Sequence, residues 1–298
     1  MNRAYIFGLI IIAQLVTSCN KKNVAINNEL KEWKLQGAVK SISETDYSKS
    51  GIYTTNLRFN PYGYIQEQSA FNPDGSMIRK WEYEYNNRNQ KLSRACFVLN
   101  DSLSEILHYS YNKSYKITEE ILLNPQGKLI SKIEHKYDIN KNEIERKYLD
   151  ENAKVQSRIL FKYDEKKNVI EELHSDSVFH QQWKQKNRYT PDGLNVEISF
   201  FSMNDSLLKR STYTYLSNKQ VSEACSYNDQ NVLISKTIYE YDTKINISGK
   251  LMFYPLDMKT EKYTFKYEYD KNKNWTSRYE YVDNELDDII TRKLEYYK

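Results

Sequence analysis

The chain has 298 residues and a formal net charge of only +4, which falls to about +3 once Arg3 is removed with a leader. So small an imbalance gives no field strong enough to indicate a nucleic-acid partner. Tyrosine is in clear excess at 27 residues, against 8 Gly and 5 Pro, and this aromatic content argues against disorder. Aromatic side chains in an otherwise polar chain favour strands with one packed face and one wet face.

A secretory signal with a lipidation site is predicted at the N-terminus, over residues 1–18. Arg3 supplies a positive charge, and a short apolar stretch follows over residues 5–15. This stretch is too short to cross a bilayer as an ordinary helix, and its flanks fit a cleaved signal. The small residues before Cys19 resemble the lipobox of bacterial lipoproteins. The resemblance implies that Cys19 is diacylated and begins the mature chain, with residues 19–32 as a tether; an uncleaved anchor with an incidental cysteine is the alternative.

A period of 26 residues organises the rest of the chain. An aromatic anchor recurs at this spacing, and two further anchors follow after gaps of 28 and 27: Phe59, Tyr85, Tyr111, Tyr137, Tyr163, Tyr189, Tyr215, Tyr241, then Tyr269 and Tyr296. Before each anchor apolar and charged residues alternate, which is the period of a strand. Trp33 lies 26 residues before Phe59, so residues 33–52 are predicted to form a degenerate unit that caps the array.

Two kinds of turn separate the strands of each unit. One follows the anchor, as at 138–142, and the other has the pattern Asn-Pro-x-Gly, as at 72–75. In the second kind Pro presets φ and Gly accepts a positive φ. Each unit is therefore a hairpin, and the predicted fold is all-β: an antiparallel meander of about 18–20 strands in one domain over residues 33–298. Because sheets twist at every strand, we expect an open twisted or spiralling sheet, its ends covered by the degenerate unit and by the strand at Tyr296.

The sequences at 137–144, 163–170 and 269–275 resemble the YD repeats of Rhs-type proteins. Each has Tyr-Asp, a short turn, an asparagine and then an apolar residue. The resemblance covers residues 53–297 and is greatest to YD-repeat lipoproteins of Bacteroidota. It implies an envelope protein with a spiralling β-shell. The usual unit is shorter, and glycine commonly stands where this chain has Asn142, Asn168 and Asn274.

Charged residues on the polar face are spaced as cross-strand pairs. The eighth residue after an anchor and the fifth before the next carry opposite charges: Glu67 and Lys80, Glu119 and Lys132, Glu145 and Arg158, Glu171 and Lys184, Glu197 and Arg210, Glu223 and Lys236. We expect each pair to lie directly opposite in its hairpin, at about 0.2–1 kcal/mol per pair. This predicts a neutralised ion-pair ladder rather than a basic groove for a polyanion.

No catalytic residue, cofactor or metal site is predicted. The sequence has no phosphate loop, nucleophile elbow or His-Glu-x-x-His motif. His135 replaces an aromatic in the repeat and is interpreted as a core residue, and His174 and His180 lack ligand spacing. Cys96 and Cys225 lie five units apart, so we expect free thiols.

Two sets of residues are candidates for function. Trp81, Trp183 and Trp275 could stack on sugar rings, although aromatic residues at this period also build the core. Ser102, Ser177 and Ser206 stand in Asp-Ser-aliphatic sequences that resemble O-glycosylation sites of Bacteroidota envelope proteins. Asp-Ser is also ordinary turn chemistry, so both interpretations stay open.

The function that these patterns favour is a non-catalytic cell-envelope lipoprotein that binds a glycan or an envelope protein and is held at the membrane through Cys19. The alternative is a passive structural or assembly component with no small ligand. The basic residues 20–23 predict an outer-membrane protein that faces the periplasm, since surface-exposed lipoproteins often carry acidic residues there. A place on the cell surface is the other address considered.

Overall fold

The computed structural model describes residues 28–49, 51–98 and 100–298. The predicted signal, Cys19 and the beginning of the tether therefore lie outside the described residues. In the part that is described, no helix is long and apolar enough to cross a bilayer.

The described chain consists of one short helix, twenty strands and one 3-10 turn, in the following order. They are α1 (Glu29–Glu32), β1 (Val39–Ser48), β2 (Gly51–Phe59), β3 (Ile65–Phe71), β4 (Met77–Tyr85), β5 (Lys91–Val98), β6 (Ser102–Tyr111), β7 (Ile117–Leu123), β8 (Leu129–Tyr137), β9 (Glu143–Leu149), β10 (Val155–Tyr163), β11 (Val169–Asp176), β12 (Gln181–Tyr189), β13 (Asn195–Ser202), β14 (Leu207–Tyr215), β15 (Val221–Tyr227), β16 (Leu233–Tyr241), β17 (Ile247–Tyr254), η1 (Pro255–Asp257), β18 (Lys259–Tyr269), β19 (Trp275–Val282) and β20 (Glu285–Tyr296).

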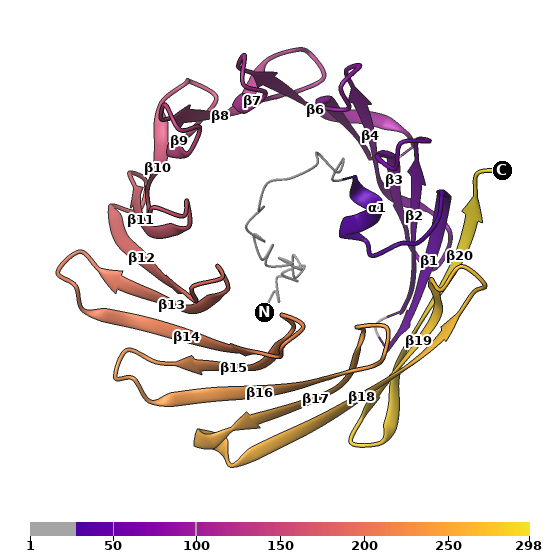
Figure 1. Cartoon of the computed structure of the whole chain (residues 1–298). Coiled ribbons are helices and arrows are strands. Elements are labelled where there is room, and N and C mark those ends of the chain that lie inside the picture. Colours follow the sequence, from indigo (N-terminus) through magenta and orange to yellow (C-terminus); the bar gives the residue numbers. More distant parts are fainter. Residues whose placement is uncertain (1–27, 50, 99) are drawn as a thin grey trace, which may run out of the picture.

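The strands form a closed up-and-down barrel (Figure 1). Each strand pairs antiparallel with its neighbours in sequence, and β1 also pairs with β20, from Val39 opposite Tyr296 to Asp46 opposite Ile290. The all-β prediction agrees with this structure, but the predicted open or spiralling sheet is wrong. The two segments predicted to cover free edges instead meet each other at the seam, and Trp33 is the C-cap residue of α1 rather than a strand anchor.

Closure follows from a bend that recurs in every unit. The register shifts by one residue at nine anchors, namely Phe59, Tyr85, Tyr111, Tyr137, Tyr163, Tyr189, Tyr215, Tyr241 and Tyr269. A β-bulge of this kind bends the strand and increases its local twist. Repeated at the same place in each hairpin, the bend curls the sheet steadily until β20 reaches β1. Strand twist alone, on which the open sheet was predicted, leaves this contribution out.

The tyrosine of the anchor satisfies the backbone beside the bulge. The Tyr137 hydroxyl donates to the Ile117 carbonyl at 2.8 Å, and the same bond, always to the residue 20 positions earlier, recurs from Tyr85, Tyr111, Tyr163, Tyr189, Tyr215 and Tyr241. The first anchor, Phe59, lacks a hydroxyl, and its side chain is fully buried. These seven tyrosines therefore have a structural role, because each satisfies a carbonyl beside a bulge.

The turns follow the predicted chemistry. After the anchor, the Lys141 amide donates to the Asp138 carbonyl at 3.0 Å, and Lys141 has a φ of 66°. In the Asn-Pro-x-Gly turn, Gly75 occupies the matching position with a φ of 82°. A residue in the left-handed region is what a five-residue hairpin turn requires, and glycine adopts it without strain.

The face of the sheet that carries the anchors is the inner wall of the barrel. The helix α1 lies inside, where Leu30 and Leu35 pack on Ile42, Leu57 and Phe59 (Figure 1). This cluster holds most of the fully buried apolar side chains; elsewhere the aromatic residues of the inner wall are half-exposed. Away from the cluster around α1, the sheet is therefore exposed to water on both faces and encloses no packed core.

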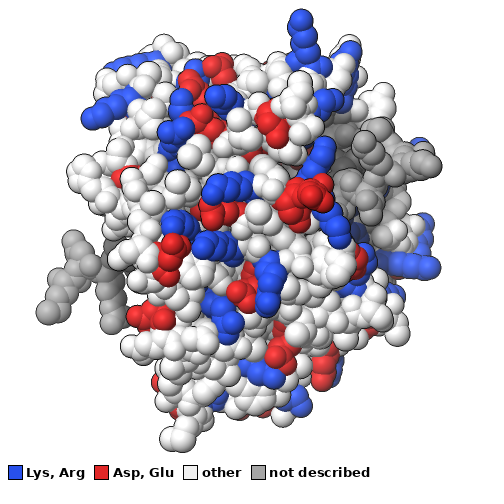
Figure 2. Space-filling model, turned by 60° about the vertical axis from the view of Figure 1, so that its left-hand side comes forward, with Lys and Arg blue, Asp and Glu red and all other residues white. Residues whose placement is uncertain are grey.

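The outer wall carries the charged residues predicted to form the ladder, but in a different register. Glu67 lies opposite Glu82, and Lys80 opposite Ser69, so the predicted partners are two residues out of line. The five-residue turn at 72–76 and the bulge beside it, where Phe71 lies opposite Met77 but Ala70 opposite Arg79, cause the offset. Basic and acidic side chains are intermixed over the outer wall on the side shown in Figure 2.

Candidate functional site

A belt of alternating charge crosses the inner wall at one height. The ninth residue after each anchor points inward, and in four successive units it is Arg94, Glu120, Arg146 and Glu172. These four residues, here called the inner belt, come from β5, β7, β9 and β11. Their neighbours on the same face are tyrosines and other rings, so the inner wall combines charges with aromatic surface.

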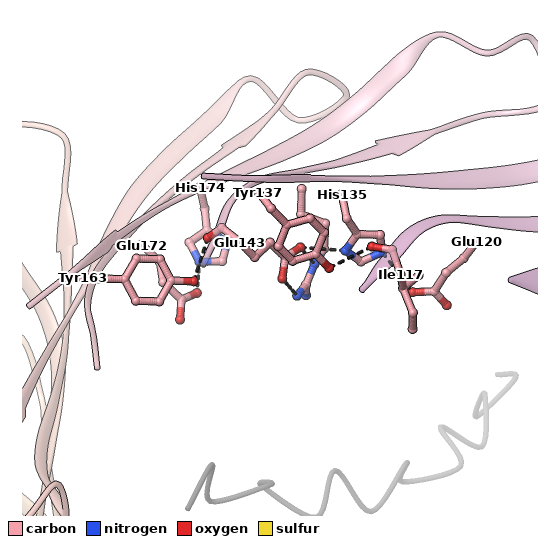
Figure 3. A network of polar contacts seen from close by, with 9 residues as sticks. Ile117, Glu120, His135, Tyr137, Glu143, Tyr163, Glu172 and His174 are labelled. Atoms are coloured by element: carbon pink, nitrogen blue, oxygen red, sulfur yellow. Dashed lines mark hydrogen bonds and ion pairs between the residues drawn. The ribbon is translucent and has the colours of Figure 1, made fainter. Parts of the chain in front are cut away.

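His135 is the centre of the most connected part of this wall (Figure 3). Its Nδ1 lies 2.7 Å from Oε1 of Glu143, and its Nε2 lies 3.1 Å from Oε1 of Glu120. Arg146 donates to both oxygens of Glu143, from Nε at 2.9 Å and from Nη2 at 2.7 Å. The His135 side chain is only 7% exposed, so the imidazole is held between two carboxylates away from bulk water.

The charged groups of this network stabilise one another's ionised forms. Burial acts to lower the pKa of His135, but the hydrogen bonds to Glu120 and Glu143 outweigh it and raise that pKa to about 9. For Glu143, burial acts to raise the pKa, and the bonds from His135 and Arg146 bring it down to about 2. At neutral pH the site therefore contains an imidazolium, a guanidinium and carboxylates in mutual contact.

A hollow of about 540 Å³ opens beside this network. It is lined at its floor by Glu120, His135, Glu143 and Arg146, and at its sides by Tyr111 and Tyr137. Tyr111 and Tyr137 donate their hydroxyls to backbone carbonyls, so their rings are fixed at the sides of the hollow.

A second cluster lies further round the same wall, on β11 to β13. The rings of His174 and Trp183 stack in parallel, with centroids 3.5 Å apart and planes 9° apart, and Phe200 tilts against Trp183 at 5.4 Å. His174 Nε2 lies 2.9 Å from Glu172 of the inner belt (Figure 3). Gln185 and Asn187 bring amide groups to the same surface, joined to each other at 3.0 Å. The cluster offers a ring surface edged by polar groups.

This arrangement is better suited to binding than to proton transfer. Both nitrogens of His135 are engaged by carboxylates, so the imidazolium has no free lone pair with which to act as a base. Glu143 is held by His135 and Arg146 at the same time. Such a paired network fixes the side chains in place and presents charge to whatever lies in the hollow.

The predicted stacking tryptophans all lie on the inner wall but do not come together. Trp81 is on β4, Trp183 on β12 and Trp275 on β19, at different heights. Trp275 has one face covered by Arg292, whose guanidinium carbon is 3.4 Å from the ring centroid. Arg79 lies over Trp81 at 5.5 Å. Trp275 also meets Tyr267 edge-on at 6.3 Å, whereas Trp183 is the one of the three with a ring stacked in parallel on it.

The other predicted residues lie on turns and on the outer wall. Ser102, Ser177 and Ser206 are exposed at connections between strands, and the Ser177 hydroxyl donates to the Gln156 carbonyl at 2.7 Å. Cys96 on β5 and Cys225 on β15 are both free, as predicted from their separation of ten strands; in addition, Cys96 pairs with Trp81 on the inner wall and Cys225 with Lys236 on the outer wall.

Four of the six predicted ion pairs are present, diagonally across their hairpins: Glu119–Lys132 at 2.6 Å, Glu145–Arg158 at 2.5 Å, Glu197–Arg210 at 3.7 Å and Glu223–Lys236 at 2.6 Å. The other two pairs are replaced by different partners. Glu67 bonds Arg58, Lys80 bonds Glu82 and Asp101, Glu171 bonds Lys162, and Lys184 bonds Asp205.

Sequence reasoning missed Glu120, Glu143, Arg146 and Glu172, and interpreted His135 as a core residue. The signal that could have found them is the period itself. The ninth position after the anchor is charged in four successive units, on the face that carries the aromatic anchors. This pattern was missed because charged residues were sought only on the polar face of the strands.

Comparison with known proteins assigns no family. The chain matches no protein-family model, and no curated protein matches it. Among solved structures it is similar to a porin-like protein from Bacteroides uniformis, with 10% identity over 87% of this chain and 98% of that chain and a TM-score of 0.41. It is also similar to a porin-like protein from Bacteroides vulgatus, with 9% identity over 88% and 99% and a TM-score of 0.35. A third similar structure is TcdB2-TccC3, with 14% identity over 77% of this chain but only 15% of that one and a TM-score of 0.39. The YD-repeat resemblance therefore stays a prediction of the sequence.

Proposed function

We propose that this chain is a non-catalytic binding protein of the cell envelope that holds a glycan against the inner wall of its barrel. The observation that carries the proposal is the strip of rings and polar groups that runs from His135 to Phe200. Saturated sugar rings present both apolar faces and hydroxyl groups. A ligand of that kind needs aromatic surface and fixed donors and acceptors side by side.

The strip has the dimensions of an extended ligand. It crosses six adjacent strands, β8 to β13, which at about 4.8 Å per strand is roughly 24 Å. At one end the hollow beside His135 offers carboxylates and a guanidinium, and at the other end the Trp183 ring surface offers stacking. Beside the rings, on the same strand as Trp183, the amides of Gln185 and Asn187 provide neutral hydrogen-bonding groups. This length favours an oligosaccharide over a single sugar.

The outer wall supports an aqueous setting for the barrel. The ion pairs of Arg158 with Glu145 and of Lys236 with Glu223 lie part-way along their strands, between the two ends of the barrel. Placing a lysine or arginine at the midplane of a bilayer costs about 2–4 kcal/mol. We propose that the wall stands in water and that the chain is held to the membrane by lipid on Cys19, facing the periplasm from the outer membrane.

A glycan array probed with the chain from Asn20 onward tests the proposal. Binding of an oligosaccharide should change the tryptophan fluorescence, and Trp183→Ala should weaken that binding about tenfold or more through loss of the ring surface. The matched control is Phe97→Ala, an aromatic of the outer wall that contacts Lys80 and should leave binding unchanged.

Two outcomes would count against this function. Equal loss of affinity in Trp183→Ala and Phe97→Ala would show that binding does not use the inner wall. Silence across the array, together with crosslinking of the barrel to an envelope protein, would favour the passive structural component instead.

A further inference from the structure

The two rims of the barrel differ in charge. The turns that follow the anchors, at 60–64, 86–90, 112–116, 138–142, 164–168, 190–194, 216–220, 242–246 and 270–274, form one rim. They contain ten basic residues: Arg88, Lys113, Lys116, Lys141, Lys166, Lys167, Lys219, Lys244, Lys271 and Lys273. All ten are exposed. This end of the barrel is here called the basic rim.

The acidic residues of the basic rim are mostly turned toward the backbone. Of its six, four are the first residues of their turns and only half-exposed: Asp138, Asp164, Asp242 and Asp270. Asp138 accepts the Asn142 amide at 2.8 Å, and the other three do the same four residues on. Only Glu165 and Asp192 are exposed, so the charge presented outward is strongly positive.

The opposite rim has the opposite sign. Its connections hold eight acidic residues, Asp74, Asp101, Asp150, Glu151, Asp205, Asp229, Asp257 and Asp283, and three basic ones, Lys49, Lys128 and Lys154. This acidic rim lies at the far end of every strand from the basic rim. The chain is therefore polarised along the barrel axis although its net charge is small.

Exposed apolar side chains stand among the lysines of the basic rim. Tyr62 is 65% exposed, Tyr115 55% and Ile139 95%, each at the tip of its turn. Large rings and aliphatic groups next to lysines are the composition of surfaces that settle into the headgroup region of a bilayer.

The first described residue also lies at this rim. Asn28, the first described residue, donates from its side chain to the Tyr62 carbonyl at 3.0 Å, and the Leu30 amide donates to the Gly63 carbonyl at 3.3 Å. Nine residues separate Cys19 from Asn28, a reach of about 30 Å at most. Any lipid on Cys19 would hold the basic rim, not the acidic one, close to a bilayer.

We propose that the basic rim docks on the surface of an anionic phospholipid bilayer, so that the barrel stands upright with its acidic rim directed away from the membrane. The lysines supply the attraction to the headgroups, and Tyr62, Tyr115 and Ile139 enter the interface between them. In this orientation the lumen opens to solvent through the acidic rim. The docking does not depend on whether the lumen binds a glycan.

Vesicle binding by the chain that begins at Asn20, which keeps α1 and all twenty strands but carries no lipid, tests the proposal. We expect it to sediment with vesicles containing phosphatidylglycerol and to remain in solution with pure phosphatidylcholine. Lys113→Gln, Lys116→Gln and Lys271→Gln together should weaken the partitioning about tenfold or more, since each lysine near an anionic surface adds to the attraction. Raising the salt concentration should release the protein as well.

The acidic rim provides a control of equal charge. Lys49→Gln, Lys128→Gln and Lys154→Gln remove the same three charges from the other end and should leave partitioning nearly unchanged. Ile139→Ser tests the apolar contact separately and should weaken binding severalfold without changing the circular dichroism of the barrel. Absence of binding to phosphatidylglycerol vesicles at low salt, or equal loss in the two triple variants, would overturn the proposal.

Discussion

The region around α1 and the seam differs from the rest of the barrel in what holds it together. Near α1, Val39, Ile42 and Phe59 are essentially inaccessible to water, and they form a small conventional core. From β5 to β18 the inner wall has almost no such residues, and the recurring stabilising contacts are tyrosine hydroxyls on carbonyls and paired charges. One chain thus uses apolar packing where its ends must meet and a periodic hydrogen-bonded design elsewhere.

This difference explains how a barrel built from similar repeats can close at a defined strand. Identical hairpins carry no feature that sets the number of strands at which the sheet closes. The helix α1, which packs against β1–β3, marks one end of the array. Glu29 of α1 accepts the Ile65 amide at 2.5 Å and pairs with Lys91 at 2.7 Å, which ties the helix to two successive units. The seam adds its own polar link, since Arg292 on β20 donates to Glu44 on β1 at 2.7 Å.

The largest expected effect comes from emptying the core. Phe59→Ala should lower the free energy of unfolding by about 4 kcal/mol, because the side chain is fully buried beneath α1. Chemical denaturation measures this loss. The comparison variant is Phe161→Ala on the half-exposed inner wall, for which we expect a much smaller loss of about 1 kcal/mol. Similar losses at both positions would mean that the two regions are packed alike.

The next effect is a pH dependence that belongs to the inner wall. The pKa of His135 is about 9 in the folded chain and near 6.5 when unfolded. Its contribution is therefore complete below about pH 6.5 and lost as the pH rises through 9, at about 3 kcal/mol. His135→Tyr, which restores the residue of the units at Tyr83 and Tyr109, should abolish this loss in unfolding curves measured from pH 6 to 9.

His108, which is exposed on the outer wall, supplies the control for that titration. His108→Gln should keep the loss of stability between pH 6.5 and 9. A profile that stays the same in His135→Tyr would show that the network around Glu120 and Glu143 does not hold a charged imidazole.

These features could be predicted from the sequence to different degrees. The anchors, the alternation before them and the turns at Asp138 and Gly75 depend on neighbours in the chain, so the strands were predictable. The seam pairs Ser43 with Lys293, and no local pattern reports a contact between residues so far apart. The bulge beside the second turn, where Phe71 lies opposite Met77, also left no sign in the sequence, which is why the predicted pairing of Glu67 with Lys80 is two residues out of line.

The candidate site shows the same division. Trp183 and His135 were visible as single residues, but their partners were not. Glu143 reaches His135 only because Tyr137 on β8 and Glu143 on β9 come together at a bulge. The strand register decides which side chains are neighbours on the inner wall. The register in turn depends on the bulges and turn lengths, which the period of the sequence does not reveal.

A smaller effect tests the hydrogen bonds of the anchors. Tyr215→Phe removes the hydroxyl that donates to the Asn195 carbonyl at 2.5 Å, while the ring remains. We expect a loss of about 1 kcal/mol in the free energy of unfolding. Tyr281→Phe on the outer wall, where the ring contacts Lys266, should change stability by much less. Equal effects would indicate that the anchor hydroxyls do not stabilise the bulges.

The smallest expected effect on stability concerns the turns that follow the anchors. Ile245 has a φ of 68°, which strains a β-branched residue, and it is 44% exposed. Ile245→Gly should therefore raise the free energy of unfolding by about 0.5 kcal/mol, the relief of strain being partly offset by the greater freedom of glycine in the unfolded chain. Gly193→Ala, at the equivalent position with a φ of 86°, should have the opposite sign. Thermal unfolding of both variants measures the pair.

Closure of the barrel is tested most directly by a crosslink across the seam. In a chain without its native cysteines, Ser43→Cys and Lys293→Cys place two thiols on paired residues of β1 and β20. Paired residues on adjacent antiparallel strands have Cα atoms about 4.5–5.5 Å apart, within the range of a disulfide. Mild oxidation should join them, whereas Ser43→Cys with Ser199→Cys, on β13, should stay reduced. Failure of the seam pair to oxidise while the chain remains folded would contradict the closed barrel.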